Sequence, residues 1–338
     1  MLIISNSLNN ISDEGCLKVA ASLVSRVKKA APETLIVTYE RKSELSDVHF
    51  EINKLMISKE LYSLLNKRKE EIIFIPFPAR TLATALRIFI LSLYTRKKLK
   101  VISVMKYSTG FISKILLRLS GADFVVFSKE AAEFYGAIVG EKRVSYLKTG
   151  VDTQKFTPVS KEKKEVLKGK YGFDSRPVIL HVGHLNRGRN IAQLMKLDKK
   201  YQVLLVTSTL TKSEQDIQLK KELLKFRNIK IIDDYIPDIE EIYQLSDVYF
   251  FPVVEQGKCI DIPLSVMEAA SCNKPIVTTD YGEMKQFREK KDFHFIESFD
   301  ECELNALIEK ALISEGADSR SSVLDYDWNN AVSHLIKT

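Results

Sequence analysis

Twelve short runs rich in Val, Ile and Phe recur along this chain, and segments with helical periodicity separate them. Almost continuous apolar runs of this kind are typical of parallel strands that crossover helices cover on both faces. The first half holds six runs: LIISN, TLIVTY, EIIFIPF, KVISVMK, DFVVFS and SYLKTG. The second half holds six more: VILHVG, YQVLLVT, IKIIDDY, VYFFPV, PIVTTD and FHFIES. This pattern predicts an α/β protein with two doubly wound, Rossmann-like domains that face each other across a cleft.

The division between the domains is expected in the segment GVDTQKFTPVSKEKKE, where a glycine turn and Pro158 lead into a lysine-rich stretch. A chain of 338 residues, 45% of them apolar, can bury two cores. We predict an N-terminal domain over 1–150, a C-terminal domain over 151–325 and a terminal helix over 326–338 that packs back on the N-terminal domain. Ligands are expected where the strands end, because loops and helix N-termini converge there.

The charge is divided unevenly between the halves. Residues 1–150 carry 24 Lys and Arg against 14 Asp and Glu, a net charge of +10, whereas residues 151–338 have a net charge of −3. No acidic residue lies between Glu71 and Asp123, and the basic residues of that stretch are Arg80, Arg87, Arg96, Lys97, Lys98, Lys100, Lys106, Lys114 and Arg118. A stretch of one sign attracts phosphate, on lipid headgroups or on an anionic acceptor.

Within this stretch, LATALRIFILSLYTRKKLK joins an apolar run to a basic tail, as helices that lie on a membrane surface do. A buried crossover helix has a similar composition, and the sequence leaves both interpretations open. We expect the basic region 80–118 to contact an anionic membrane. No run is long enough to span a bilayer, and the four cysteines lack CxxC spacing. We therefore predict a cytoplasmic protein that associates peripherally with the membrane face.

The turn after VILHV has the sequence Gly183-His184-Leu185-Asn186-Arg187-Gly188-Arg189, and it is expected to open a helix. Backbone N–H groups and the helix dipole favour anions at such a turn, and Arg187 or Arg189 adds charge-assisted hydrogen bonds. The turn is therefore a candidate diphosphate site. A basic turn on a solvated loop is the alternative.

Two further candidate loops follow later strands. Pro263 suits the first turn of a helix that would bury Glu268, and a carboxylate there needs a partner. A ribose diol is one candidate, and a lysine or a backbone cap is the structural alternative. The loop Asp280-Tyr281-Gly282-Glu283 could close over a donor sugar or serve as an ordinary turn and cap.

The order of these pieces is more specific than any one of them. GVDTQKFTP, a strand ending in VGHLNRG, IPDIEEIYQLSDVYFFP and PLSVMEAASCNKPIVTTDYGE together resemble the C-terminal half of the group 1 (family 4 type) glycosyltransferases, with the closest likeness over residues 145–290. The resemblance implies the two-domain GT-B fold and a retaining, metal-independent transfer from a UDP- or GDP-linked sugar, without a separate cofactor. It also implies a glycan or lipid-linked acceptor.

The resemblance also implies site residues. Arg187 matches the family's diphosphate-binding lysine, and Glu268 matches the second glutamate of the E-x7-E motif, which holds the ribose. Ile260 stands where the first glutamate is expected, so Asp261 or Glu255 would replace it, and Asp261 is preferred. We therefore assign catalysis to Asp261, Arg187 and Glu268. The full set expected at the donor is Gly183, His184, Arg187, Arg189, Asp261, Ser265, Glu268, Tyr281, Gly282 and Glu283.

The N-terminal half is less informative. Gly15 stands where the family has its glycine-rich acceptor loop, and Lys106 follows a predicted strand, so both are assigned to the acceptor side. The displaced acidic residue and the replacement of a family glycine by Tyr281 keep a second hypothesis open. In it, the chain binds a nucleotide sugar or a protein partner without turnover. Nucleic-acid binding lacks supporting motifs, and no GxGxxG indicates a dehydrogenase.

Overall fold

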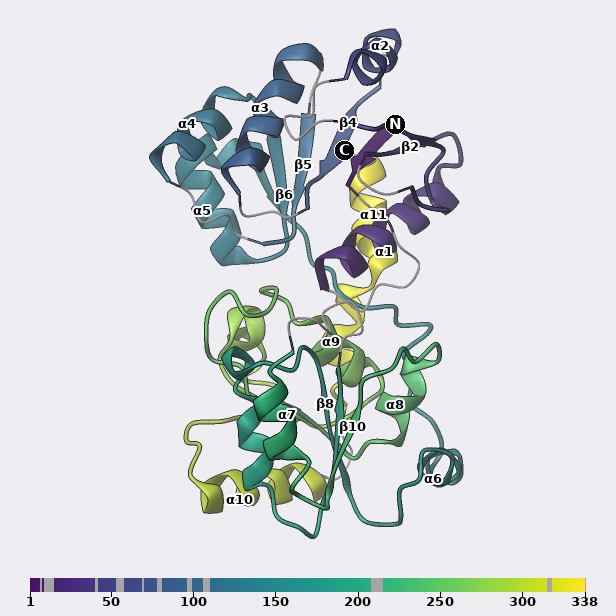
Figure 1. Ribbon diagram of the computed structural model, residues 1–338, viewed down its shortest axis with the longest axis vertical. Coiled ribbons are helices and arrows are strands. Elements are labelled where there is room, and N and C mark those ends of the chain that lie inside the picture. The colour runs from purple at the N-terminus through teal and green to yellow at the C-terminus, as the bar shows by residue number, and fades with distance from the viewer. Residues whose placement is uncertain are drawn as a thin grey trace. The chain divides into compact units, whose positions relative to one another are not determined.

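The chain divides into two compact units. One unit comprises Met1–Thr149 with Trp328–Thr338, and the other comprises Gly150–Asp327. The terminal helix α11 (Trp328–Lys337) thus belongs to the N-terminal unit, where it packs against α1 (Gly15–Ala30) (Figure 1). The computed structural model describes residues 1–6, 8, 15–39, 42–52, 58–68, 70–77, 81–95, 99–105, 110–207, 215–314 and 318–337.

The N-terminal unit is built on a seven-stranded parallel sheet in the order β3-β2-β1-β4-β5-β6-β7. Its strands are β1 (Leu2–Ser5), β2 (Leu35–Thr38), β3 (Val48–His49), β4 (Ile72–Ile75), β5 (Leu99–Ser103), β6 (Asp123–Val126) and β7 (Val144–Tyr146). Six of them coincide with the predicted runs. Strand β3 was missed because its two residues form no apolar run.

Helices cover both faces of this sheet. They are α1, α2 (Lys59–Lys67), α3 (Leu82–Thr95), α4 (Phe111–Leu119), α5 (Lys129–Val139) and α11. The path from β4 through β5 and β6 to β7 moves along the sheet in one direction, so right-handed crossovers place α3, α4 and α5 on one face. The step from β1 to β2 moves the other way and places α1 on the opposite face. Figure 1 shows α3, α4 and α5 grouped together, apart from α1 and α11.

Helix α3 is the segment whose composition matched either a membrane helix or a crossover helix. It buries Ala85, Ile88 and Leu91 in the core of the N-terminal unit, which identifies it as a crossover helix. Two basic residues of the acid-free stretch also point inward: the Arg87 guanidinium lies over the Tyr39 ring, and Lys100 pairs with Glu71 at 3.0 Å. Positions 80, 96–98 and 106 lie outside the described residues. No helix within the described parts of the chain is long and apolar enough to cross a membrane.

The C-terminal unit has a six-stranded parallel sheet in the order β10-β9-β8-β11-β12-β13. Its strands are β8 (Val178–Val182), β9 (Gln202–Val206), β10 (Ile229–Ile232), β11 (Val248–Phe251), β12 (Ile276–Thr278) and β13 (Phe293–Phe295). Its α-helices are α6 (Lys161–Lys170), α7 (Ile217–Leu223), α8 (Ile239–Leu245), α9 (Leu264–Ser271) and α10 (Glu301–Leu312). All six strands match the predicted runs, and the prediction of an α/β fold with two Rossmann-like units is confirmed.

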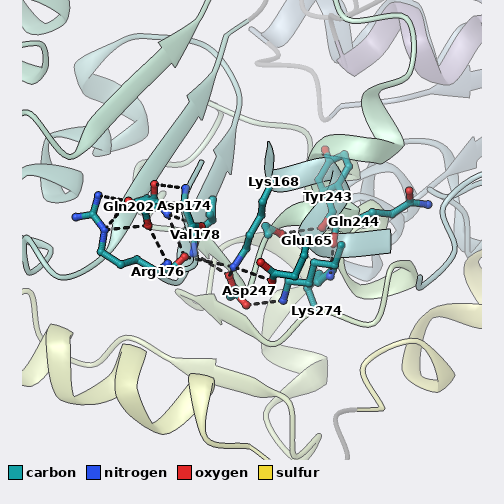
Figure 2. A network of polar contacts seen from close by, with 12 residues as sticks. Glu165, Lys168, Asp174, Arg176, Val178, Gln202, Tyr243, Gln244, Asp247 and Lys274 are labelled. Carbon is teal, nitrogen blue, oxygen red and sulfur yellow. Dashed lines mark hydrogen bonds and ion pairs between the residues drawn. The ribbon is translucent and has the colours of Figure 1, made fainter. Parts of the chain in front are cut away.

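A network of charged side chains fastens α6 to the amino ends of β8 and β11 (Figure 2). The Asp247 carboxylate, just before β11, accepts a hydrogen bond from the Val178 amide at 2.8 Å and pairs with Lys164 and Lys168. Burial alone would raise the pKa of Asp247, but the two lysines and the Val178 amide outweigh it and lower that pKa. These groups therefore satisfy one another at the edge of the sheet opposite to the strands' carboxyl ends.

Candidate functional site

Three loops meet at the carboxyl ends of the adjacent strands β8, β11 and β12. The Asn190 side chain, after β8, donates to the Pro252 carbonyl at 3.2 Å, just beyond β11. The Thr279 hydroxyl, after β12, donates to the Val253 carbonyl. These side chains fix the first residues of each loop against the neighbouring loop, so the candidate site rests on connected backbone.

The turn after β8 differs from the prediction in its secondary structure. No α-helix opens there, and the chain forms two short 3₁₀ segments, Arg187–Arg189 and Ile191–Lys196. Asn190 between them adopts a left-handed conformation with φ of 56°, which interrupts the helix. Because short 3₁₀ segments align few peptide dipoles, the attraction of this turn for anions must come mainly from side chains.

The two arginines of the turn have different surroundings. Arg187 is about half exposed and forms ion pairs with Asp216 at 3.1 Å and Glu222 at 3.0 Å. Arg189 is only 8% exposed, and its Nε has no hydrogen-bond partner among the described residues. A buried guanidinium with an unsatisfied N–H is costly, and an anion would relieve that cost. Arg189 is thus the better placed of the two to bind phosphate.

The absence of a side chain at Gly183 makes room for Arg189. A Cβ atom on Gly183 would lie 2.6 Å from Arg189 Nη1 and 3.1 Å from His181 Nε2. His181 is fully buried on β8, and its Nδ1 lies 2.8 Å from the Phe250 carbonyl, so Nδ1 carries the proton. Burial, with a smaller contribution from the Arg189 charge, lowers the pKa of His181 to about 4, although the hydrogen bond to the Phe250 carbonyl acts in the opposite direction. The imidazole beside Arg189 is therefore neutral at pH 7.

Lys258 is a residue that the sequence analysis missed. It lies in the loop between β11 and α9, and a Cβ atom on Gly188 would come within 2.6 Å of its Cε. Its ammonium group pairs with Glu255 at 3.2 Å. Lys258 thus brings a third cation to the turn that holds Arg187 and Arg189. The position of Lys258 beside this turn could not be predicted, because a single lysine in a long loop belongs to no motif.

Tyr281 clamps the loop that precedes α9. It is almost fully buried, its hydroxyl accepts from the Cys259 amide at 2.9 Å, and the same hydroxyl donates to the Cys259 carbonyl at 2.5 Å. Burial is the main reason that its pKa is raised to about 12, so the phenol stays protonated and can keep both bonds at neutral pH. The side chain that replaces the family's glycine therefore fixes the conformation of the neighbouring loop.

Gly282 brings the β12 loop into direct contact with Asp261. The Glu283 amide donates to the Asp261 carbonyl at 2.9 Å, and a Cβ atom on Gly282 would lie 2.2 Å from that oxygen. Gly282 also has a φ of +56°, so both its conformation and its surroundings require glycine. The structure thus brings together Asp261, Tyr281, Gly282 and Glu283 from two separate loops.

Glu268 lies on the buried side of α9. It is 2% exposed, and its Oε2 accepts a hydrogen bond from the Tyr243 hydroxyl of α8 at 2.7 Å. Ser265, one turn earlier, interacts with the Tyr249 hydroxyl, which also contacts Val182 at the end of β8. Pro263 is the N-cap of α9, one residue before the helix begins. The partner that the buried Glu268 carboxylate required includes this tyrosine.

The remaining predicted residues are scattered. His184 lies in the β8 turn, where its carbonyl accepts from the Asn186 amide at 3.1 Å. Gly15 is the first residue of α1 in the N-terminal unit. Lys106, the other residue assigned to the acceptor side, lies outside the described residues. The structure therefore groups the residues predicted for the donor and leaves the acceptor side without a described cluster.

Comparison with known proteins gives this arrangement a family. Residues 176–313 match the family described as glycosyl transferases group 1, and this range contains every donor-side residue predicted from the sequence. The match covers less than half of the chain and agrees with the family that the sequence motifs resemble. A relative from Campylobacter jejuni, named N,N'-diacetylbacillosaminyl-diphospho-undecaprenol alpha-1,3-N-acetylgalactosaminyltransferase, is 26% identical over 184 residues. That alignment covers 50% of this chain and 46% of the relative, so the chain matches about half of the relative's length.

Solved structures resemble the chain over its whole length. A glycosyltransferase from Rickettsia africae has a TM-score of 0.80 at 16% identity and covers 99% of this chain and 97% of its own. HepE from Anabaena, in complex with UDP, has a TM-score of 0.77 at 13% identity and covers 99% of this chain and 98% of its own. At such low identity these likenesses establish the fold alone. The segment that matches the group 1 glycosyltransferase family thus lies within a chain of the GT-B fold.

Proposed function

We propose that this chain transfers a sugar from a nucleotide-sugar donor to an acceptor, and that the donor binds at the carboxyl ends of β8, β11 and β12. The observation that carries the proposal is Arg189, a buried guanidinium whose Nε has no partner among the described residues, in the segment that matches the group 1 glycosyltransferase family. The negatively charged diphosphate of the donor would neutralise this guanidinium and accept a hydrogen bond from its Nε. Arg189 would stabilise the nucleotide as it leaves, with support from Lys258 and Arg187.

The other donor contacts follow from the loops that Tyr281 and Gly282 hold in place. Asp261 would bind hydroxyls of the donor sugar, and Glu268 would bind the nucleotide ribose beside Tyr243. The resemblance to the family supports retention of configuration and independence of metal ions. Positioning and charge stabilisation would then be the protein's main contribution. The UDP named with the Anabaena structure makes UDP-sugars the first donors to try, ahead of GDP-sugars.

The acceptor is proposed to be a glycan or a lipid-linked molecule bound by the N-terminal unit, on the side of Gly15 and Lys106. The name of the Campylobacter relative includes a diphospho-undecaprenol acceptor, which supports a lipid-linked diphosphate as the acceptor class. An acceptor of this kind lies in a membrane. We therefore place the protein at the cytoplasmic face of a membrane, with the basic N-terminal unit in contact with anionic lipid.

Calorimetric titration of the full chain with UDP, GDP and ADP tests the donor site. We expect one of the three to bind, and we expect Arg189→Met to weaken it at least tenfold, because charged hydrogen bonds contribute about 1.5 to 3 kcal/mol. Arg187→Met is the comparison variant and should weaken binding less than Arg189→Met does, since Asp216 and Glu222 already neutralise the Arg187 charge. The melting temperature of the ligand-free protein should not fall in Arg189→Met, because removing a buried unpaired charge relieves a desolvation cost.

Two outcomes would contradict this assignment. If no nucleotide binds the wild type, the transferase proposal has lost its foundation. If Arg189→Met destabilises the protein and binds nucleotide normally, Arg189 has a structural role. Where a nucleotide binds, incubation of its sugar conjugate with lipid-linked acceptors in the presence of a chelator tests turnover without metal, and NMR of the product's anomeric proton reports retention or inversion.

The non-catalytic alternative is favoured by one observation. Ile260, a buried apolar residue, stands where the family has the first glutamate of its motif. In this alternative the chain binds a nucleotide sugar without transfer or hydrolysis. Tight nucleotide binding together with an intact donor after prolonged incubation, with and without acceptor, would support it.

A further inference from the structure

Helix α4 presents an unusual surface to solvent. Four of its nine residues are exposed large hydrophobic side chains: Phe111 is 78% exposed, Ile112 61%, Ile115 40% and Leu119 65%. Ser113 and Leu117, on the other side, are buried against the N-terminal unit. The helix therefore has an inner face that serves the core and an apolar outer face that the described parts of the chain leave uncovered.

The outer face has a regular arrangement. Phe111, Ile115 and Leu119 are spaced four residues apart, so they lie above one another along the helix, and Ile112 borders them. Lys114 and Arg118, also four residues apart and both exposed, form a parallel basic stripe beside the apolar one. Apolar and basic stripes side by side are typical of helices that lie in a membrane interface.

A groove next to α4 extends this surface. It has a volume of about 330 Å³ and is lined by Phe111, Lys114, Ile115 and Arg118 of α4 together with Phe134 and Ile138 of α5. Its lining is mostly apolar, with basic residues from one side. Folded monomers rarely expose large side chains in such a cluster unless the cluster is used.

The charge around α4 favours one kind of partner. No acidic residue occurs anywhere between Glu71 and Asp123, which includes the whole of α4 and the segments before it. A second copy of the chain would bring a like-charged stripe against this one, whereas anionic headgroups complement it and acyl chains accommodate the apolar stripe. This surface is therefore more complementary to an anionic bilayer than to the same surface on a second copy of the chain.

We propose that the outer face of α4 docks on an anionic lipid bilayer, with Phe111, Ile112, Ile115 and Leu119 in the interface and Lys114 and Arg118 against lipid phosphates. Most of α4 lies within the basic region 80–118 that the sequence predicts to contact a membrane, one helix after the LATALRIFILSLYTRKKLK segment. In Figure 1, α4 lies on the far side of α3 and α5 from α1 and α11. Lipid docking by α4 rests on the membrane placement made under the proposed function and names the surface that would provide it, but it does not require the transfer reaction.

Co-sedimentation of the full chain with vesicles tests the docking surface. We expect binding to phosphatidylcholine vesicles that contain phosphatidylglycerol, little binding to phosphatidylcholine alone, and weaker binding at high salt. The double variant Lys114→Gln/Arg118→Gln should lose about thirtyfold in affinity, since each basic residue near the surface contributes about fivefold. The double variant Ile112→Ser/Leu119→Ser should lose at least tenfold, because each buried methylene adds to interfacial binding.

The matched control is Ile217→Ser/Leu224→Ser, which removes two exposed apolar residues, 68% and 56% exposed, at α7 of the C-terminal unit. This variant should bind vesicles as the wild type does. All these positions are on the surface, so circular dichroism and nucleotide titration should be unchanged, which separates loss of docking from loss of the donor site. Wild-type affinity in both α4 variants would overturn the proposal. So would equal binding to neutral vesicles, or a dimer in sedimentation velocity that the α4 substitutions dissolve without any effect on lipid binding.

Discussion

The two units of this protein use similar sheets in different ways. In the C-terminal unit, side chains from Asn190, Thr279 and Tyr281 join the loops of three neighbouring strands to one another. In the N-terminal unit, the most distinctive described surface is a helix face, and it is defined by what it leaves exposed. The C-terminal unit holds its candidate site together by internal hydrogen bonds, whereas the N-terminal unit leaves an apolar face of α4 exposed.

The charges of the two units show that net charge does not locate an anion site. The N-terminal unit has the positive excess, yet Arg87 and Lys100 point inward to Tyr39 and Glu71. The C-terminal half is slightly acidic, yet it gathers three cations at the β8 turn. Burial and the presence or absence of a partner decide where an anion can bind, and Arg189 is a buried cation whose Nε has no hydrogen-bond partner among the described residues.

The largest effect should come from Gly282→Ala. Its Cβ would overlap the Asp261 carbonyl at 2.2 Å, and its left-handed backbone would add about 1 to 3 kcal/mol of strain. We expect a clear fall in the melting temperature and loss of nucleotide binding. Gly121→Ala in the N-terminal unit is the matched control, because Gly121 also has a left-handed φ, +67°, but no atom within 4 Å of the added Cβ. An equal fall in melting temperature in the two variants would show that the contact between Gly282 and Asp261 does not contribute to the effect.

A smaller effect is expected from Tyr281→Phe. Loss of the hydroxyl removes its two hydrogen bonds to the buried backbone of Cys259, which costs about 1 to 3 kcal/mol in unfolding free energy. Donor affinity should fall about tenfold as the Asp261 loop loosens. Urea unfolding and nucleotide titration measure the two effects, with Tyr235→Phe, 45% exposed, as the control. A variant with lower stability and unchanged affinity would show that the clamp does not position the site.

Much of the C-terminal unit could be predicted from the sequence because its information is local. Buried strands appear as apolar runs, and turns such as Gly183 and Gly282 follow them directly. The prediction of an α-helix after β8 was wrong because nothing in the sequence reveals that Asn190 adopts a left-handed conformation. The hydrogen bond between Glu268 and Tyr243 could not be predicted either, since Tyr243 is 25 residues away on another helix.

The N-terminal unit was harder to predict for a different reason. The segments FISKILLRL and LATALRIFILSLYT have similar compositions, yet α3 exposes large apolar side chains only near its ends, at Leu82, Leu93 and Tyr94, whereas α4 exposes an apolar stripe along its whole length. Which of two apolar helices stays exposed depends on sheet order and on the length of the crossovers, and neither can be read from one segment. The sequence therefore predicts a membrane-binding region but does not indicate which of its helices keeps an exposed apolar face.

The smallest expected effect is a difference between the two units in how their stability depends on pH. The two histidines that are buried within the described residues, His181 and His294, both lie in the C-terminal unit, and burial lowers the pKa of each. For His181 the folded pKa of about 4 lies below the ordinary 6.5, so from pH 7 downward the unfolded chain takes up a proton that the folded chain does not. Stability that is present above pH 6.5 is lost as the pH falls toward 4.

Between pH 7 and pH 5.5 this linkage should cost the C-terminal unit about 1 kcal/mol for His181. Hydrogen exchange, corrected for the intrinsic rate, should therefore show weaker protection in β8 and β11 at pH 5.5, with little change in β1 and β4. His181→Asn, which retains a donor for the Phe250 carbonyl, should flatten the pH dependence, and His294→Asn should leave the contribution of His181 in place. Bound nucleotide should also flatten it, because a phosphate beside Arg189 would raise the pKa of His181 in the folded state. If nucleotide binds without changing this slope, the anion site lies away from His181 and Arg189.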